Sequence, residues 1–456
     1  MLKNILKSEF SRNVMTLLTG SAIAQFIPLL LTPVLSRLFS PEEFGLFAFY
    51  YTLVSFFLVI ATGRYELAIL LPKKDKEAIN VMGLAILLSG ILSIFLLLAL
   101  FIFKIPIQNL LGKPDLNQWL YLIPVCVFVG SGYKVLTYWS NRKKRFKGTS
   151  ISVVTQATLR SSTVFYFGLL KSGFFGLSVA TITFFKEIFH KSYAVPVGVT
   201  ELGIAGFILG YVIGFGSAFL TLIFAFIKND RELLFQISRK QMKAMGIRYK
   251  KFPQINMFHA MTDEFKNSGV TLIISYVFSD IVLGLYSMTY RVLRAPLSVI
   301  GNSFSQVFLQ KAAEMYANKQ SYLPIIHKVT KKLATISLPF FILVMLFGPQ
   351  IFEFILGDKW STAGEYARYL SPWLFVQFVT APITQIAVII EKQKELFLIS
   401  LINNAIIIGS LVVGGFVFNN ILIGFAVLSI LQIIYSIYLY KWILRVSKKA
   451  IEENQL

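Results

Sequence analysis

Apolar stretches long enough to cross a membrane recur along the whole chain, and this pattern restricts the fold more than any other feature. Hydrophobic residues make up 56% of the 456 residues and charged residues only 14%, whereas soluble domains are about a quarter charged. A helix needs about 20 mostly apolar residues to cross a bilayer, and a transmembrane β-barrel would show short alternating segments instead. The sequence therefore predicts an all-α polytopic membrane protein.

The apolar stretches predict twelve transmembrane helices, six before and six after a basic stretch at 228–252. The predicted spans are 13–37, 44–71, 78–103, 117–140, 149–170, 201–227, 253–278, 281–308, 333–356, 363–390, 395–417 and 420–442. An even number of spans in each half is typical of transporters built from parallel repeats, which bind their substrate between the halves. We therefore predict an N-terminal bundle at 1–227, a cytoplasmic amphipathic linker at 228–252 and a C-terminal bundle at 253–456.

The distribution of lysine and arginine indicates how the protein is oriented in the membrane. They concentrate in the connections at 73–76, 142–147, 228–251 and 311–332, whereas the alternate connections are poor in them. Because cytoplasmic loops carry the excess of basic residues, we predict cytoplasmic termini. The first apolar run continues to Val34, past a possible signal-peptide site at Ala22–Ala24, so we also predict an uncleaved first helix. The basic face suits an anionic leaflet. This basic face accounts for most of the net charge of +22. We therefore predict membrane lipids, and not nucleic acid, as partners.

The segment 171–200 is apolar enough to suggest a further span. A thirteenth span would place the basic residues of 228–252 outside the cell, against the charge rule. We therefore predict an outer loop with a helix lying at the membrane interface.

Several charged residues remain inside the predicted spans, where each costs a few kcal/mol at least. The cations are Arg37, Arg64, Lys134, Arg160, Lys266, Arg291, Arg294 and Arg368. The acids at similar depth are Glu66, Asp263 and Glu264. Arg37 and Arg368 lie near the outer ends, where their side chains can reach the interface. The excess of deep cations points to an anionic ligand, and the three acids are candidates for ion coupling or for balancing nearby arginines.

Helical spacing suggests how these charges pair. Asp263 and Lys266, three residues apart, share a helix face and can neutralise each other. Arg64 and Glu66, two apart, are expected to point to nearly opposite sides and to need different partners. Arg291 and Arg294 lie three apart on one face with no acid within a turn, which suits an anion that arrives from elsewhere.

Motifs for other chemistry are missing. The sequence has no GxxxxGK[ST] motif, no identifiable Ser/His/Asp set and one cysteine, Cys126. The histidines are scattered without metal-ligand spacing: His190, His259 and His327. Gly210 and Gly214 form a GxxxG motif, most simply a helix-packing face. We predict a protein that is not an enzyme and has neither a metal nor a cofactor.

Four motifs resemble one transporter family. They are RLFSPEEFGLFAFY (37–50), ATGRYELAILLPKK (61–74), LGLYSMTYRVLRAPLSVIGNSFSQVF (283–308) and FGPQIFEFILGDKWSTAGEYARYLSPW (347–373). With NRKKRFK (141–147), they resemble the polysaccharide-transporter, or O-antigen flippase, branch of the exporter superfamily that also holds the multidrug extruders and lipid II flippases. The resemblance covers nearly the whole chain.

The resemblance implies two six-helix bundles around a central cationic cavity in the bacterial cytoplasmic membrane. It implies that undecaprenyl-diphosphate-linked oligosaccharide, a repeat unit of O-antigen or of capsule or exopolysaccharide, moves from the inner to the outer leaflet. A polysaccharide polymerase and a chain-length regulator are further candidate partners. Arg64, Arg291 and Arg294 fall in motifs of this branch, whereas Lys134, Arg160 and Lys266 are nominated from depth alone.

Three other functions stay open. A lipid II flippase shares the same charge logic, and a multidrug antiporter shares the fold but needs more intramembrane carboxylates for cationic drugs. A membrane-embedded polysaccharide polymerase or glycosyltransferase acts on similar lipids, but it needs a catalytic surface that the outer loops do not offer.

Overall fold

The computed structural model describes residues 9–172 and 199–455, and all regular structure within these ranges is helical. The predicted interfacial helix at 171–200 falls almost entirely outside the described residues. The described part divides into two compact units, unit 1 (Met1–Phe39 and Leu46–Ser268) and unit 2 (Ser40–Gly45 and Gly269–Leu456). Helices α3 and α12 each contribute residues to both units.

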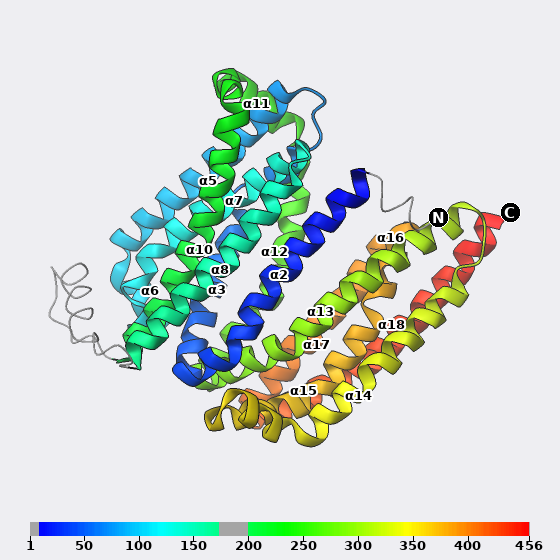
Figure 1. Ribbon diagram of the computed structural model, residues 1–456. Helices are drawn as coiled ribbons and strands as arrows, with labels where there is room; N and C mark the ends of the chain where they lie inside the picture. The colour runs from blue at the N-terminus through cyan, green and yellow to red at the C-terminus, as the bar shows by residue number, and fades with distance from the viewer. Residues whose placement is uncertain (1–8, 173–198, 456) are drawn as a thin grey trace. The chain divides into compact units, whose positions relative to one another are not determined.

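The helices before the basic stretch build most of unit 1 (Figure 1). Its α-helices are α2 (Glu9–Leu38), α3 (Pro41–Ile60), α4 (Tyr65–Ala68), α5 (Asp75–Ile102), α6 (Lys104–Leu111), α7 (Ile123–Arg142), α8 (Phe146–Lys171), α10 (Val199–Asp230), α11 (Arg239–Arg248) and α12 (Met257–Ile273). Shorter 3-10 and π turns join them: η1 (Pro114–Leu116), η2 (Trp119–Leu122), η3 (Arg231–Gln236) and η4 (Phe252–Asn256). Helix α8 packs against both α2 and α10.

Unit 2 is built mainly on α13 to α18. Its helices are α13 (Asp280–Ala317), α14 (Leu323–Leu356), α15 (Ser361–Thr380), α16 (Ile386–Ile389), α17 (Gln393–Val412) and α18 (Ile421–Gln455). Short turns accompany them: η5 (Ile274–Phe278), η6 (Asp358–Trp360), η7 (Pro382–Gln385) and η8 (Val413–Val417). Helix α15 packs against α13, α14 and α18.

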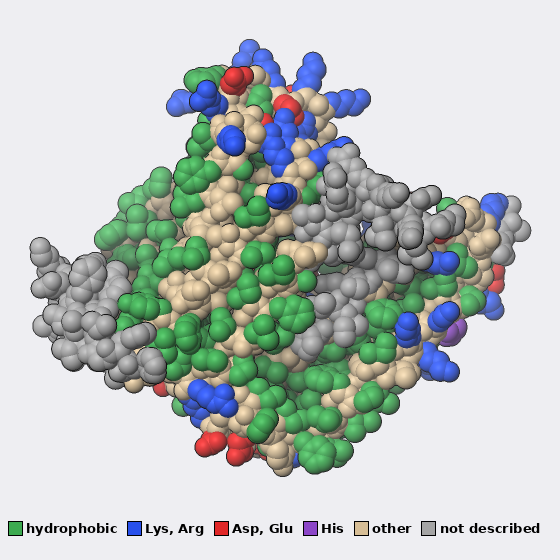
Figure 2. Space-filling view, in the orientation of Figure 1, with side chains coloured by type: hydrophobic (Ala, Val, Ile, Leu, Met, Phe, Trp, Pro, Cys, Tyr) green, Lys and Arg blue, Asp and Glu red, His purple; other side chains and the backbone are tan. Residues whose placement is uncertain are grey.

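The surface of α5 is apolar where a soluble protein would be polar. Its exposed side chains follow a helical stripe: Ile91, Ile94, Phe95, Leu98, Phe101 and Ile102. Exposed apolar patches of this extent mark a surface that contacts lipid or another protein. Figure 2 shows the same contrast on one face, with apolar side chains over the helices and lysines and arginines gathered at the end of unit 1 that carries α11.

Each predicted span overlaps a helix in the described residues, but 44–71 is divided between α3 and α4, and 363–390 between α15 and α16. Nine helical stretches there are long and apolar enough to cross a membrane. The three other predicted spans lie in α8, α12 and α13, outside these nine stretches. These three helices carry four of the six nominated cations, Arg160, Lys266, Arg291 and Arg294, so the less apolar spans hold most of the nominated cations.

The GxxxG motif has the predicted packing role. A Cβ atom at Gly210 would lie 2.8 Å from Val164 Cγ2, and one at Gly214 would lie 2.8 Å from Arg160 Cβ. The two glycines therefore let α10 approach α8 closely, and this approach helps to position Arg160.

Candidate functional site

The helix that was predicted to run through 44–71 breaks at residues 61–64. Gly63 and Arg64 both have positive φ, +57° and +62°, and the Tyr65 amide bonds to the Thr62 carbonyl at 3.2 Å. A left-handed conformation is uncommon for a residue other than glycine, and such residues gather at functional sites. The break ends α3 and starts α4 with Arg64 at the corner.

The break brings Arg64 and Glu66 into contact, so the prediction that they point to opposite sides is wrong. Arg64 Nη1 lies 3.3 Å from Glu66 Oε1. The two-residue spacing separates side chains only on a continuous helix, and the two left-handed residues end that continuity. Glu66 is buried, and its other carboxylate oxygen accepts a hydrogen bond from the Thr62 hydroxyl.

Lys134 on α7 joins this pair. It interacts electrostatically with Glu66, with Arg64 and with Glu264 of α12. Glu264 in turn accepts hydrogen bonds from Ser55 Oγ at 2.5 Å and from Ser268 Oγ at 3.3 Å. Lys134 therefore interacts with two carboxylates that come from different helices.

Arg160 extends the group along α8. Its guanidinium lies over the rings of Phe47 and Tyr211, at 5.6 Å and 5.7 Å from the centroids. Tyr51 packs edge-on against Tyr211 and interacts electrostatically with both Arg160 and Glu264. Tyr51 thus links Arg160 to Glu264.

We call Arg64, Glu66, Lys134, Arg160 and Glu264 the unit 1 cluster. Its three cations and two acids leave one excess positive charge when all are ionised. Arginine suits a phosphate because its planar fork donates two parallel hydrogen bonds, and an apolar surrounding strengthens such contacts. The cluster can therefore bind an anion at the level of the membrane-embedded helices.

Sequence reasoning missed three polar neighbours of these charges: Tyr51, Ser55 and Thr62. Tyr51 and Ser55 are spaced by four residues in an otherwise apolar helix, so they share a face. That spacing could have shown that α3 turns a polar face towards the charged residues.

Two of the predicted site residues on α12 lie outside the unit 1 cluster: Asp263 and Lys266. Asp263 is exposed, and its Oδ2 lies 4.0 Å from His259 Nδ1. Within the described residues it forms no ion pair with Lys266, so the expected pairing of Asp263 with Lys266 is wrong. Asp263 and His259 are four residues apart, about one helical turn, so they share a helix face just as Asp263 and Lys266 do.

In unit 2, Arg291 and Arg294 lie on aromatic rings. The Arg291 guanidinium is 5.6 Å from the Phe44 centroid, and that of Arg294 is 5.1 Å from the Tyr290 centroid. Arg294 also donates a hydrogen bond to the Tyr290 hydroxyl. Because an aromatic face attracts a cation without neutralising it, Arg294 keeps its charge available to an anion.

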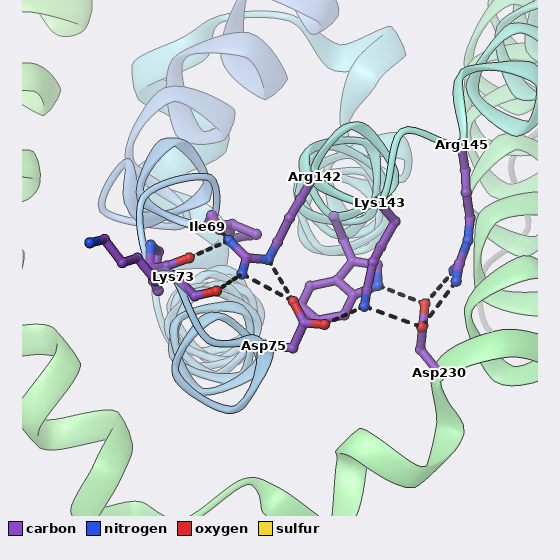
Figure 3. Close-up of polar contacts among 9 residues, drawn as sticks. Ile69, Lys73, Asp75, Arg142, Lys143, Arg145 and Asp230 are labelled. Atoms are coloured by element: carbon purple, nitrogen blue, oxygen red, sulfur yellow. Dashed lines mark hydrogen bonds and ion pairs between the residues drawn. The ribbon is translucent and has the colours of Figure 1, made fainter.

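A polar cluster closes one end of unit 1 (Figure 3). Asp75, at the start of α5, pairs with Arg142 at 3.0 Å and with Lys143 at 2.5 Å. Asp230, at the end of α10, pairs with Arg145 and lies 3.9 Å from Lys143. In the sequence these basic residues indicate topology and, within NRKKRFK, a family resemblance; in the structure they also tie the ends of α5, α7 and α10 together.

Arg142 also holds the segment that follows α4. It donates hydrogen bonds to the carbonyls of Ile69 at 3.2 Å and Pro72 at 2.7 Å. Tyr65, next to Arg64, donates to the Gly246 carbonyl of α11 at 2.9 Å. The short helix α4, which contains Glu66, is therefore held by contacts to α7 and α11.

Comparison with known proteins decides the family. Residues 34–184 and 177–365 match the sequence profile of a family described as "Polysaccharide biosynthesis protein". The chain belongs to this family. A search of curated proteins finds no match to the sequence.

Solved structures of transporters share the fold. A structure titled "Lipid II flippase MurJ, inward closed conformation" matches with a TM-score of 0.72 and 14% identity over 97% of this chain and 90% of that one. An inward-facing multidrug resistance MATE family transporter of the MOP superfamily matches with a TM-score of 0.62 and 13% identity over 95% and 96%. The predicted fold class, an all-α polytopic membrane protein, is confirmed, and the fold is shared with these two structures.

Proposed function

We propose that the protein flips undecaprenyl-diphosphate-linked oligosaccharide, a repeat unit of O-antigen or of capsule or exopolysaccharide, from the inner to the outer leaflet of the bacterial cytoplasmic membrane. The observation that carries the proposal is the unit 1 cluster, an excess of cations on membrane helices in a member of a polysaccharide biosynthesis family. A lipid-linked diphosphate accounts for both the cations and the family. Lipid-linked sugars are intermediates of polysaccharide biosynthesis, and the negative charge of the diphosphate needs cationic partners inside the membrane.

The proposed mechanism uses the same residues for binding. Arg64, Lys134 and Arg160 contact the diphosphate from unit 1, and Lys266 is a further candidate there. Arg291 and Arg294 contribute cations from unit 2. The bundles predicted at 1–227 and 253–456 alternate in opening to each leaflet, with 228–252 as their cytoplasmic connection. Membrane lipids surround the protein, and a polysaccharide polymerase and a chain-length regulator are the proposed partners downstream.

A lipid II flippase is the second candidate, favoured by the fold shared with the MurJ structure. It would use the same cationic residues for a diphosphate carrying a different sugar. A multidrug antiporter is less well supported, because a cationic drug requires free carboxylates, and Glu66 and Glu264 both have hydrogen-bond partners.

Reconstitution tests the proposal. Purified protein in liposomes is expected to flip fluorescent undecaprenyl-diphosphate-linked oligosaccharide, measured as loss of fluorescence to an impermeant quencher. Lipid II and ethidium, assayed in parallel, represent the two other candidates. Empty liposomes give the background, and Lys74→Ala, at an exposed lysine of unit 1, is the control variant. Transport of ethidium alone would contradict the proposal, and a clear preference for lipid II would replace it with the second candidate.

The orientation has a separate test. A single cysteine at Lys243 of α11 is expected to resist impermeant thiol reagents in intact cells, because we place α11 in the cytoplasm. A single cysteine at Lys113 is expected to react. The parent protein, whose Cys126 is buried, gives the background labelling. Labelling of position 243 from outside would overturn the twelve-span topology and support a thirteenth span within 171–200.

A further inference from the structure

We infer that the Glu66 carboxylate is a built-in competitor of the substrate: it occupies Arg64 in the empty site and is displaced when a diphosphate binds. This inference rests on the proposed function and adds a role for one acid within it. The first support is geometric. A carboxylate bound to a guanidinium presents an oxygen where a phosphate oxygen would lie, and here the two groups are 3.3 Å apart.

Arg64 retains capacity for another acceptor. Its Nε is buried and has no hydrogen-bond partner among the described residues. A buried donor without an acceptor is costly, so Glu66 satisfies the guanidinium only in part. A diphosphate has more oxygens than a carboxylate and can engage Nε together with the terminal nitrogens.

The backbone conformation before Glu66 holds its carboxylate against Arg64. The left-handed Gly63 and Arg64 bring the carboxylate back to the arginine, and the Thr62 hydroxyl holds its second oxygen. Strained backbone of this kind persists only when its surroundings enforce it. Contacts from α7 and α11 supply that enforcement.

Displacement of Glu66 does not strand a buried charge. Lys134 interacts electrostatically with Glu66 as well as with Glu264. A carboxylate that leaves Arg64 therefore still has a cationic neighbour, which avoids the large penalty for an unpaired buried ion.

A tethered competitor serves transport because a flippase must release its substrate as well as bind it. Tight binding that is equal in all states slows the release step, whereas an internal anion returns to Arg64 as the diphosphate leaves. Removing the competitor should therefore tighten binding and slow flipping at the same time.

The test is a pair of substitutions at Arg64 and Glu66, with binding of farnesyl diphosphate to protein in nanodiscs as the measurement. Glu66→Gln is expected to raise the affinity roughly tenfold, the factor supplied by about one charge-assisted hydrogen bond, and to lower the flipping rate in liposomes. Glu66→Asp, which keeps the charge, is expected to gain less affinity than Glu66→Gln. In an Arg64→Ala background, Glu66→Gln is expected to give no gain.

The test includes a control variant and several outcomes that would contradict the inference. Glu232→Gln, at an exposed acid of unit 1, controls for loss of one negative charge at a distance. If folded Glu66→Gln binds no more tightly, or if its gain survives removal of Arg64, the inference is wrong. If Glu66→Gln does not fold, an affinity of Glu66→Asp far below that of the unchanged protein contradicts it. If the unchanged protein neither binds farnesyl diphosphate nor flips the lipid-linked glycan, the proposed function itself fails.

Discussion

Changing Arg291 and Arg294 together to alanine is expected to abolish nearly all glycan export while transporter abundance stays close to normal. Each guanidinium that contacts the diphosphate contributes about 1.5–3 kcal/mol. Losing two such contacts costs about 3 kcal/mol or more, and each 1.4 kcal/mol is a factor of about ten. We therefore expect a loss of roughly a hundredfold, measured as surface glycan by immunoblot beside transporter level by an epitope tag.

Two further variants separate binding from structure. Lysine at both positions is expected to rescue export partly, because it keeps the charge but loses the two-pronged geometry. Lys328→Ala, at an exposed lysine of unit 2, is the control and is expected to export normally. A fall in abundance in the double alanine variant would instead assign the arginines to packing on Phe44 and Tyr290. Full export would remove both residues from the mechanism.

The second large effect is on folding and concerns the close approach of α3 and α13 in unit 2. Gly284→Ala is expected to prevent normal accumulation of the protein, because its Cβ would lie 1.6 Å from the Pro41 carbonyl oxygen. A Cβ at Gly45, on the other side of the crossing, would lie 1.8 Å from the Asp280 carbonyl oxygen. Overpacking usually costs about 1–3 kcal/mol, and a clash with backbone is at the upper end or beyond.

The backbone at this crossing has little freedom to move away. The Ser40 amide donates to Glu43 Oε2 at 2.7 Å, and the Glu43 amide donates to Ser40 Oγ at 3.3 Å. This reciprocal pair is a capping box that fixes the start of α3. The clash is therefore expected to shift the whole crossing rather than one side chain.

Gly409→Ala on α17 is the matched control. A Cβ there would meet nothing within 4 Å, so the change is expected to be neutral or to stabilise the helix by up to about 1 kcal/mol. The measurement is the melting temperature of purified protein in detergent, together with abundance in membranes. A Gly284→Ala protein that melts like the control would show that the crossing tolerates a methyl group.

Much of the candidate site was predictable because placing a charge inside the membrane costs free energy, so such residues are usually functional. Arg64, Lys134, Arg160 and Glu264 were singled out by their depth in the predicted spans, Arg64 also by a family motif, and all four lie within unit 1. The error at Arg64 and Glu66 arose because a helical period was extended across Gly63. Nothing in the local pattern distinguishes a glycine within a helix from one that ends it.

The sequence by itself determined the class of the protein, the positions of its helices and the residues that carry charge into the membrane. It could do so because the cost of placing polar groups in lipid acts on each residue separately and leaves a readable pattern. Only the tertiary structure decided which charges meet: the turn at residues 61–64, the pairing of Arg64 with Glu66, and the rings beneath Arg160 and Arg294. These contacts depend on backbone angles and on side chains distant in the chain, because a partner on another helix is chosen by packing rather than by spacing.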